Sequence, residues 1–432
     1  MILKNVRMLL NGRLEPVNLS FSDKIDIISK HPLEGDEVVD GNNNILLPGM
    51  IDPHVHFREP GLTNKEDFYT GSCAAAAGGV TTVCDMPNTV PPTITKGKLM
   101  QKLRMAKKSI VNFGLHFGAA LNNLEEIRLA NDVSFSPALK VFMGSTTGEL
   151  FIDDALILKQ VFSASRKIIA VHAEDERLIE KNMAHFRGEH DPSIHSKIRS
   201  HQVAVQAVMR AIETARATRS ELHICHLSTS DELQVIRDKR FPLSWEATPH
   251  HLFMTIKDYK RLGNCAKMNP PLRYDADRQA LWDALKTGNN CFVASDHAPH
   301  SLKEKHEDYW KAPGGVPGVE TSLPLLLNEV NKTALSLSRL INITSLNAAL
   351  RYRMIGKARI KEGYDADLVL VDMKMKKRIK NDDLFTKCGW SPFEGRELQG
   401  WPVKTFVNGN LVFEDGSIYD EKKGRPIHCK LD

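Results

Sequence analysis

Two histidines near the start of the chain stand two residues apart. His54 and His56 lie in the segment DPHVHFR, which follows an apolar stretch typical of a buried strand. Residues two apart in a strand point to the same side, so both imidazoles can bind one metal ion. Alone, such a pair is more often incidental, because histidine commonly occupies partly buried strand positions. It indicates a metal site only if other ligands join it.

Three further candidate ligands each end a strand-like run elsewhere in the chain. His172 ends AVH, His226 ends HICH and Asp296 ends VASD. Nitrogen and carboxylate ligands without thiolates suit zinc, and less well manganese or cobalt. Chance placement of all these residues at strand ends is improbable, so we predict a metal centre rather than a set of core histidines.

Lys140 is the candidate bridge between two ions. These ligands, shared by two ions, leave each ion under-coordinated unless another group joins them. Lys140 ends a strand-like run in LKVFMG. A lysine there is usually exposed or ion-paired, but carbamylation by carbon dioxide would give it a carboxylate-like group. We predict two divalent ions, with zinc as the preferred metal, bridged by carbamylated Lys140.

One pattern recurs between residues 44 and 300: a β-branched run, a polar residue at its end, then a stretch with helical spacing. The pattern occurs eight times. Strands that alternate with helices pair in parallel, and eight such strands favour a closed (β/α)₈ barrel over an open sheet. Active sites of such barrels lie at the carboxyl ends of the strands, where the candidate ligands fall. The predicted strands are residues 45–57, 80–88, 113–120, 138–144, 168–174, 222–228, 243–250 and 291–300.

The predicted helices lie between these strands, and several follow a Thr, Asp or Ser that can cap them. They are residues 65–77, 95–109, 153–164, 200–217, 230–240 and 274–286.

Both ends of the chain have a different pattern of short strands and turn signals such as GNNN and VNGN. Because neither end is long, we expect them to pair into one small β-sandwich. The predicted organisation is α/β, with residues 44–355 as the barrel and residues 1–43 and 356–432 as the two parts of the sandwich.

Length and composition agree with a globular enzyme. A chain of 432 residues exceeds one simple core, and 42% hydrophobic with 26% charged residues excludes a mainly disordered or fibrous protein. No apolar run reaches membrane-spanning length, and the N-terminus lacks the pattern of a signal peptide. We therefore expect a cytoplasmic protein without a membrane partner.

Charge and cysteine usage exclude other kinds of site. The net charge of +5 comes partly from lysine clusters at 101–109 and 373–380, and no aromatic residues interleave with these lysines. Solvated faces are favoured over nucleic-acid binding, while the mild excess suits a small anionic substrate. The seven scattered cysteines contain no CxxC pair, which argues against disulfides or a thiolate zinc site.

Several motifs resemble those of bacterial dihydroorotases of the amidohydrolase superfamily, over nearly the whole chain. They are DPHVHFREPGLTNKED, GGVTTVCDMPNTVPPT, LKVFMGSTTG, HICHLST, TPHHL, NPPLR and SDHAPH. Within the superfamily, the arginine of HFREPG and the asparagine of MPNT favour a dihydroorotase over related enzymes. Allantoinases typically have asparagine in place of that arginine, and dihydropyrimidinases lack the REPG segment.

The resemblance implies a role for each candidate residue. The residues that it implies for one metal are His54, His56, Lys140 and Asp296, and those for the other are Lys140, His172 and His226. The residues that it implies for the substrate are Arg58, Asn88 and His300 at the carboxylate and Asn269 at the ring. The glycine-rich residues 314–320 resemble the family's substrate-side loop.

The implied reaction is the reversible hydrolysis of (S)-dihydroorotate to N-carbamoyl-L-aspartate in de novo pyrimidine biosynthesis. A metal-bridged hydroxide would attack the ring amide, with Asp296 as the general base. Arg58 can bind the substrate carboxylate through two parallel hydrogen bonds. Superfamily resemblance also makes a homodimer an expectation.

Two alternatives stay open. An allantoinase or hydantoinase would use the same metals with different anchoring residues, and a non-catalytic paralogue would scaffold another pyrimidine enzyme. Loss of metal ligands would mark the paralogue, and none of the expected ligands is missing.

Three residues near the candidate ligands in the motifs above are expected to have structural roles. For His250 and His251 of TPHHL we expect a supporting role, because the ligand set is already complete. Cys225, beside His226, should point away from the metal by strand alternation and pack in the core.

Overall fold

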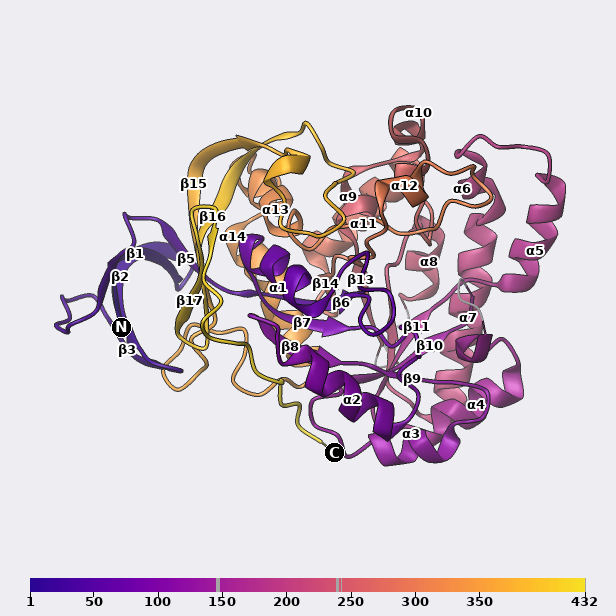
Figure 1. Ribbon diagram of the computed structural model, residues 1–432, viewed down its shortest axis with the longest axis horizontal. Coiled ribbons are helices and arrows are strands. Elements are labelled where there is room, and N and C mark those ends of the chain that lie inside the picture. The colour runs from indigo at the N-terminus through magenta and orange to yellow at the C-terminus, as the bar shows by residue number, and fades with distance from the viewer. Residues whose placement is uncertain (145–147, 238–240, 242, 432) are drawn as a thin grey trace.

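The computed structural model describes residues 1–144, 148–237, 241 and 243–431. It contains a barrel of parallel strands ringed by helices, with a curled sheet at one side (Figure 1). The C-terminal end of the predicted helix 230–240 lies outside the described residues.

The barrel strands form two parallel sheets, β6-β7-β8 and β9 to β14 in sequence order. Only His116 separates β8 from β9, so together they occupy one barrel position. A parallel bridge from Val55 to His297 joins the first strand to the segment after the last, and the predicted eight-fold closure is confirmed. The strands are β6 (Met50–Val55), β7 (Val80–Asp85), β8 (Asn112–Leu115), β9 (Phe117–Gly118), β10 (Ala138–Phe142), β11 (Ile168–His172), β12 (Leu222–Ile224), β13 (Leu243–Ala247) and β14 (Cys291–Val293).

The six predicted helices are found as α1, α2, α4, α7, α8 and α11, with shifted ends. Capping residues explain where several helices begin. The side chains of Asp67, Thr95 and Asp154 accept hydrogen bonds from backbone N–H groups at the beginnings of α1, α2 and α4. No helix of the described residues is both long and apolar enough to span a bilayer. The helices are α1 (Phe68–Ala77), α2 (Lys96–Ala106), α3 (Leu124–Ala130), α4 (Ala155–Ala164), α5 (Glu176–His185), α6 (Ile194–Ile198), α7 (His201–Thr218), α8 (Ser230–Val235), α9 (Pro249–Phe253), α10 (Tyr259–Leu262), α11 (Asp275–Thr287), α12 (Leu302–Lys305), α13 (Ser322–Asn331), α14 (Leu337–Ile341) and α15 (Asn347–Arg351).

Both termini build one nine-stranded sheet in the order β18-β17-β16-β15-β5-β1-β2-β3, with β4 beside β1. Its N- and C-terminal halves meet where β5 pairs antiparallel with β15, and the sheet curls around a shared core containing Val6, Phe21 and Phe406 (Figure 1). The strands are β1 (Ile2–Leu10), β2 (Arg13–Phe21), β3 (Ile25–Ser29), β4 (Val38–Asp40), β5 (Ile45–Pro48), β15 (Leu368–Arg378), β16 (Glu397–Val407), β17 (Asn410–Glu414) and β18 (Ser417–Ile418).

The first predicted barrel strand, residues 45–57, is in fact two strands. Its first part, β5, belongs to the terminal sheet, and only β6 belongs to the barrel. Gly49 separates them at a close contact, because a Cβ atom there would lie 2.1 Å from the Thr81 hydroxyl oxygen. The chain therefore passes from one sheet to the other through the residue that has no side chain.

Candidate active site

His54, His56 and Asp296 meet at the carboxyl ends of β6 and β14. The Oδ1 atom of Asp296 lies 3.2 Å from Nε2 of His54 and 3.2 Å from Nε2 of His56. One candidate ligand atom from each residue lies within 4.8 Å of the others. The structure thus brings together the two histidines and the distant aspartate, as strand spacing predicted.

His172 ends β11, and His226 lies two residues after the end of the neighbouring strand β12. Their rings pack edge to face with centroids 4.5 Å apart, and the ring of His226 lies 5.3 Å from that of His54. The Nδ1 atom of His226 is buried and has no hydrogen-bond partner among the described residues. A buried ring nitrogen without a partner, beside further nitrogen and oxygen donors, fits a metal ligand.

The environment favours neutral imidazoles, the form that binds metals. Burial lowers the pKa of His54, and burial together with Arg58 lowers the pKa of His56 well below its usual value. Burial and the neighbouring His172 have the same effect on the pKa of His226. These rings can therefore offer lone pairs without first losing a proton.

Lys140 lies on β10 and is completely buried. Its Nζ atom lies 3.0 Å from Sγ of Cys225 and 5.1 Å from the centre of the Phe142 ring. No carboxylate of the described residues forms an ion pair with it. The charge of Lys140 interacts with Asp296 only beyond ion-pair distance. A buried ammonium without a close counter-ion is costly, so the position suits a lysine whose charge is changed by modification.

The Cys225 side chain does not point in the direction expected from the sequence. Strand alternation predicted that its side chain would point away from the ligands, but its sulfur faces Lys140 and lies within 4.8 Å of ligand atoms of His54 and Glu246. The reason is that β12 ends at Ile224, and His226 has a φ of 37°, so the alternation stops before Cys225. Burial raises the pKa of the Cys225 thiol to about 12, which argues against a nucleophile.

Glu246, on β13, is a functional residue that the sequence reasoning missed. Its carboxylate accepts hydrogen bonds from Nδ1 of His54, from Nε2 of His223 at 3.0 Å and from the backbone N–H of His226 at 3.2 Å. Burial would raise its pKa, but His54 and His223 lower it well below its usual range. Glu246 therefore turns Nε2 of His54 toward Asp296. A charged residue inside an apolar strand was the available signal.

Glu174 has a similar place beside His172. Its Oε2 atom lies 2.8 Å from Nε2 of His172 and 2.6 Å from Nη1 of Arg199. Two of the candidate metal-binding histidines thus contact buried carboxylates, which fix ring orientation.

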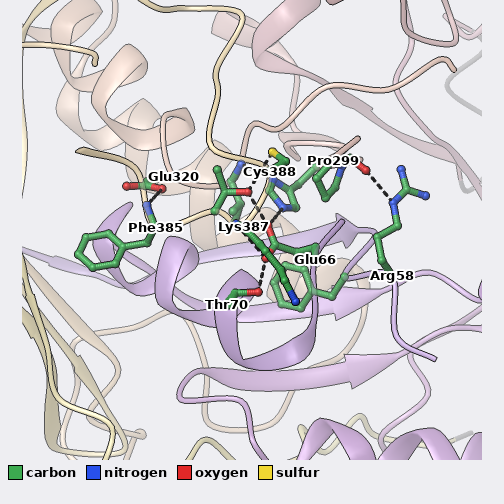
Figure 2. Close-up of polar contacts among 12 residues, drawn as sticks. Arg58, Glu66, Thr70, Pro299, Glu320, Phe385, Lys387 and Cys388 are labelled. Carbon is green, nitrogen blue, oxygen red and sulfur yellow. Dashed lines mark hydrogen bonds and ion pairs between the residues drawn. The ribbon is translucent and has the colours of Figure 1, made fainter. Parts of the chain in front are cut away.

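Arg58 and His300 lie beside the cluster, in the loops that follow β6 and β14. Nε of Arg58 donates to the Pro299 carbonyl at 3.1 Å (Figure 2). Its Nη2 lies 3.1 Å from Nε2 of His300. Burial lowers the pKa of Arg58 to about 10, so the guanidinium remains charged at neutral pH. Asn88 lies beside the histidine cluster, because its Oδ1 is 2.8 Å from Nδ1 of His56.

Asn269 is held by His195, a residue for which the sequence carried no spacing signal. Nε2 of His195 lies 2.8 Å from Oδ1 of Asn269, and its Nδ1 lies 2.9 Å from the Tyr309 hydroxyl. The glycine-rich loop lies against Asn269, because a Cβ on Gly314 would be 3.0 Å from its Nδ2. The structure therefore brings the predicted ring-contacting residue and the predicted substrate-side loop together.

His251 has the structural role expected for it. Its Nδ1 lies 2.8 Å from the Thr248 hydroxyl, and its Nε2 lies 3.1 Å from the Pro270 carbonyl. Both ring nitrogens are thus occupied, Nδ1 at the start of α9 and Nε2 at the segment after Asn269. The Nε2 atom of His250 is buried without a hydrogen-bond partner among the described residues, and its predicted supporting role stays a prediction.

Comparisons with known proteins agree with this arrangement. Residues 45–412 match the amidohydrolase family. The chain is 40% identical to the dihydroorotase of Methanosarcina acetivorans, over 98% of this chain and 94% of that protein. It is 39% identical to the dihydroorotase of Halobacterium salinarum, over 97% of this chain and 98% of that protein.

Solved structures of cyclic-amide hydrolases have the same fold. The L-hydantoinase (dihydropyrimidinase) of Arthrobacter aurescens superposes with a TM-score of 0.92 at 29% identity, covering 97% of each chain. The dihydropyrimidinase of Brevibacillus agri gives a TM-score of 0.91 at 26% identity, covering 98% of this chain and 97% of that one. The chain therefore belongs to the amidohydrolase family of metal-dependent hydrolases and, within it, groups with the dihydroorotases.

Proposed function

We propose that this amidohydrolase is a dihydroorotase, which reversibly hydrolyses (S)-dihydroorotate to N-carbamoyl-L-aspartate in de novo pyrimidine biosynthesis. The observation that carries the proposal is the buried guanidinium of Arg58 beside the histidine and aspartate cluster. Dihydroorotate combines a ring amide, which needs the cluster, with a carboxylate, which needs the cation. The names of the archaeal relatives support the same reaction.

The proposed centre would hold two divalent ions, with zinc as the first candidate, and a carbamylated Lys140 would be a ligand of both. Buried, neutral imidazoles and the buried Lys140, which forms no ion pair with the described residues, support this ligand set. When bound, the ions would polarise the scissile carbonyl and lower the pKa of a coordinated water. The ligands proposed for one ion are His54, His56, Lys140 and Asp296, and those for the other are Lys140, His172 and His226.

Asp296 is the proposed proton carrier. Burial raises the pKa of its carboxyl group, while His54 opposes that shift. In hydrolysis it accepts a proton from the attacking water and delivers it to the leaving ring nitrogen. In cyclisation it must start protonated, so we expect ring closure to be favoured toward lower pH.

Arg58, Asn88 and His300 are the proposed carboxylate-binding residues, and Asn269 the ring-contacting one. Because Nε of Arg58 already donates to Pro299, its two Nη groups form the end that can meet the substrate. A compact anion offers little apolar area, so these polar contacts must supply most of its binding and orientation.

The principal rival is a hydantoinase-type enzyme, because solved hydantoinases have the same fold. Assaying the purified protein on dihydroorotate, hydantoin, dihydrouracil and allantoin, with metal content measured on the same sample, separates the hypotheses. We expect the highest kcat/KM on dihydroorotate and about two ions per chain. Faster turnover of hydantoin or allantoin would support the rival, and absence of turnover in metal-loaded protein would support a non-catalytic paralogue.

Two expectations concern the whole protein. A cytoplasmic location and a homodimer stay predictions. The first can be checked by fractionation of cells and the second by light scattering from the purified protein.

A further inference from the structure

His300 lies between two cations that can only donate hydrogen bonds. Its Nε2 atom is 3.1 Å from Nη2 of Arg58, and its Nδ1 atom is 3.1 Å from Nζ of Lys65. Burial, followed by Arg58 and Lys65, lowers the pKa of His300 far below its usual value, although the Gly314 carbonyl opposes the shift. A neutral imidazole has one accepting nitrogen. Only one of the two contacts can therefore be a hydrogen bond.

The surroundings of Lys65 indicate which contact it is. Its ammonium is fixed 2.7 Å from Oε1 of Glu304, whose Oε2 accepts the backbone N–H of Ser301 at 3.0 Å. Oε2 of Glu304 lies 3.9 Å from Nδ1 of His300, which is too far to accept a hydrogen bond. A fixed donor thus faces Nδ1, which favours an unprotonated Nδ1 and a ring proton on Nε2.

The loop that carries Lys65 is anchored by the next residue. Glu66 is completely buried, and its carboxylate accepts hydrogen bonds from the hydroxyls of Thr70 and Thr386 and from the backbone N–H of Lys387 at 3.2 Å (Figure 2). The last two partners belong to the segment between β15 and β16. Because Glu66 is held from both sides, the backbone of Lys65 is fixed as well.

The same C-terminal segment holds the other partner. Nε1 of Trp390 donates to the His300 carbonyl at 2.7 Å, and Trp390 is itself buried. Residues 386–390 therefore fix both the loop of Lys65 and the backbone of His300. The short distance between the two side chains is thus set by the fold from two directions.

We propose that Lys65, held by Glu304, is a positioning residue that keeps His300 in the tautomer with its proton on Nε2. His300 and Arg58 then each present a donor at the same place, and the nearby Gly314 carbonyl can accept a hydrogen bond from the His300 ring while the site is empty. A carboxylate oxygen can accept from both, so the pair is preorganised for an anion. This inference rests on the proposed dihydroorotase function for the identity of that anion.

The kinetic test replaces Lys65 by methionine, which keeps most of the side-chain volume and removes the donor. In metal-loaded Lys65→Met, KM for dihydroorotate should rise about ten- to a hundred-fold, the range for a charge-assisted hydrogen bond. Its kcat should change much less, and kcat/KM for dihydrouracil, which has no carboxylate, should stay within about two-fold. Lys65→Arg should recover part of the loss, because arginine restores a charged donor.

The matched control is Lys303→Met. Lys303 is exposed and directly precedes Glu304, so the same change there should leave both substrates unaffected. Equal losses on both substrates in Lys65→Met would show a general structural role and overturn the proposal. An unchanged KM for dihydroorotate in folded Lys65→Met would overturn it as well.

A second measurement needs no substrate. Nitrogen NMR of protein with labelled histidine reports the tautomer of each ring, and the His300 signals are identified by their absence in His300→Gln. We expect the Nε2–H tautomer in the wild type and a mixture in Lys65→Met, whereas an Nδ1–H tautomer in the wild type would overturn the proposal. If the wild type has the expected tautomer but does not hydrolyse dihydroorotate, the proposed function is wrong and the positioning of His300 stands.

Discussion

The two halves of the candidate site are built by opposite means. In the metal half, His54 and His172 lie at strand ends, and the buried carboxylates of Glu246 and Glu174 orient them. In the anion half, Arg58 and His300 lie in loops, and a further cation, Lys65, orients the imidazole. Carboxylates beside imidazoles favour metal binding, whereas an excess of donors over acceptors favours an anion.

The charges of the groups in the two halves of the site also differ. Glu246 stays ionised because His54 and His223 lower its pKa against the effect of burial. In the anion half, burial and the cations lower the pKa of His300 instead, so the ring stays neutral and able to donate. The metal half therefore offers an ionised carboxylate and neutral rings to a cation, and the anion half keeps an excess of positive charge for the substrate.

The largest expected effect comes from Lys140→Ala, because this residue would belong to both metal sites. The variant should lose binuclear metal binding and most of its activity on every substrate. Short carboxylic acids should restore part of the activity by filling the space of the carbamate. Metal analysis with activity assays in acetate or propionate checks this, and a fully active Lys140→Ala enzyme would contradict the bridging role.

Asp296→Asn should also affect all substrates, through proton transfer. Turnover should fall about 10²- to 10⁴-fold, while substrate binding changes much less and the fold is retained. One metal site should weaken, because Asp296 lies 3.2 Å from Nε2 of both His54 and His56. Steady-state kinetics with a thermal melt checks this. Rates within a few-fold of the wild type would assign the proton transfer to another residue.

The sequence predicted the metal half better than the anion half, for a physical reason. Strand alternation and the position of strand ends are local properties, so His54, His56 and Asp296 could be grouped from spacing alone. Arg58 and His300 lie in loops without a period and came only from the resemblance.

The residues that hold these loops were not predicted at all. Lys65, Glu66 and Trp390 act through contacts between distant segments, such as the bond from Thr386 to Glu66. Even in the metal half the local rule failed at Cys225, where the strand had already ended.

Arg58→Ala should separate the two halves, because it removes only the anion contact. Leaving the substrate carboxylate unpaired should cost about 2 to 5 kcal/mol, a loss of about thirty-fold to several-thousand-fold in kcat/KM on dihydroorotate. Arg58→Lys should recover part of this, since an ammonium cannot form the planar pair of bonds. Activity on dihydrouracil should hardly change in either variant. Equal losses on both substrates would mean that Arg58 supports the structure of the whole site.

The smallest expected effect concerns Glu246, which touches the proposed ligand His54 and not the substrate. In Glu246→Gln the amide keeps one acceptor but turns an N–H toward a ring that also donates, so either His54 or His223 must rotate or change tautomer. Metal affinity should fall about 10- to 100-fold. A competition titration with a chelator measures this directly.

Activity of Glu246→Gln should return toward the wild-type value when excess metal is supplied, because the lost group orients a ligand and takes no part in proton transfer. His250→Ala is the matched control, since it also removes a polar group from a buried side chain near β13 but should leave metal content unchanged. Unchanged metal affinity in Glu246→Gln would show that strand geometry alone orients His54. In that case the contrast between carboxylates in the metal half and cations in the anion half would have no functional consequence.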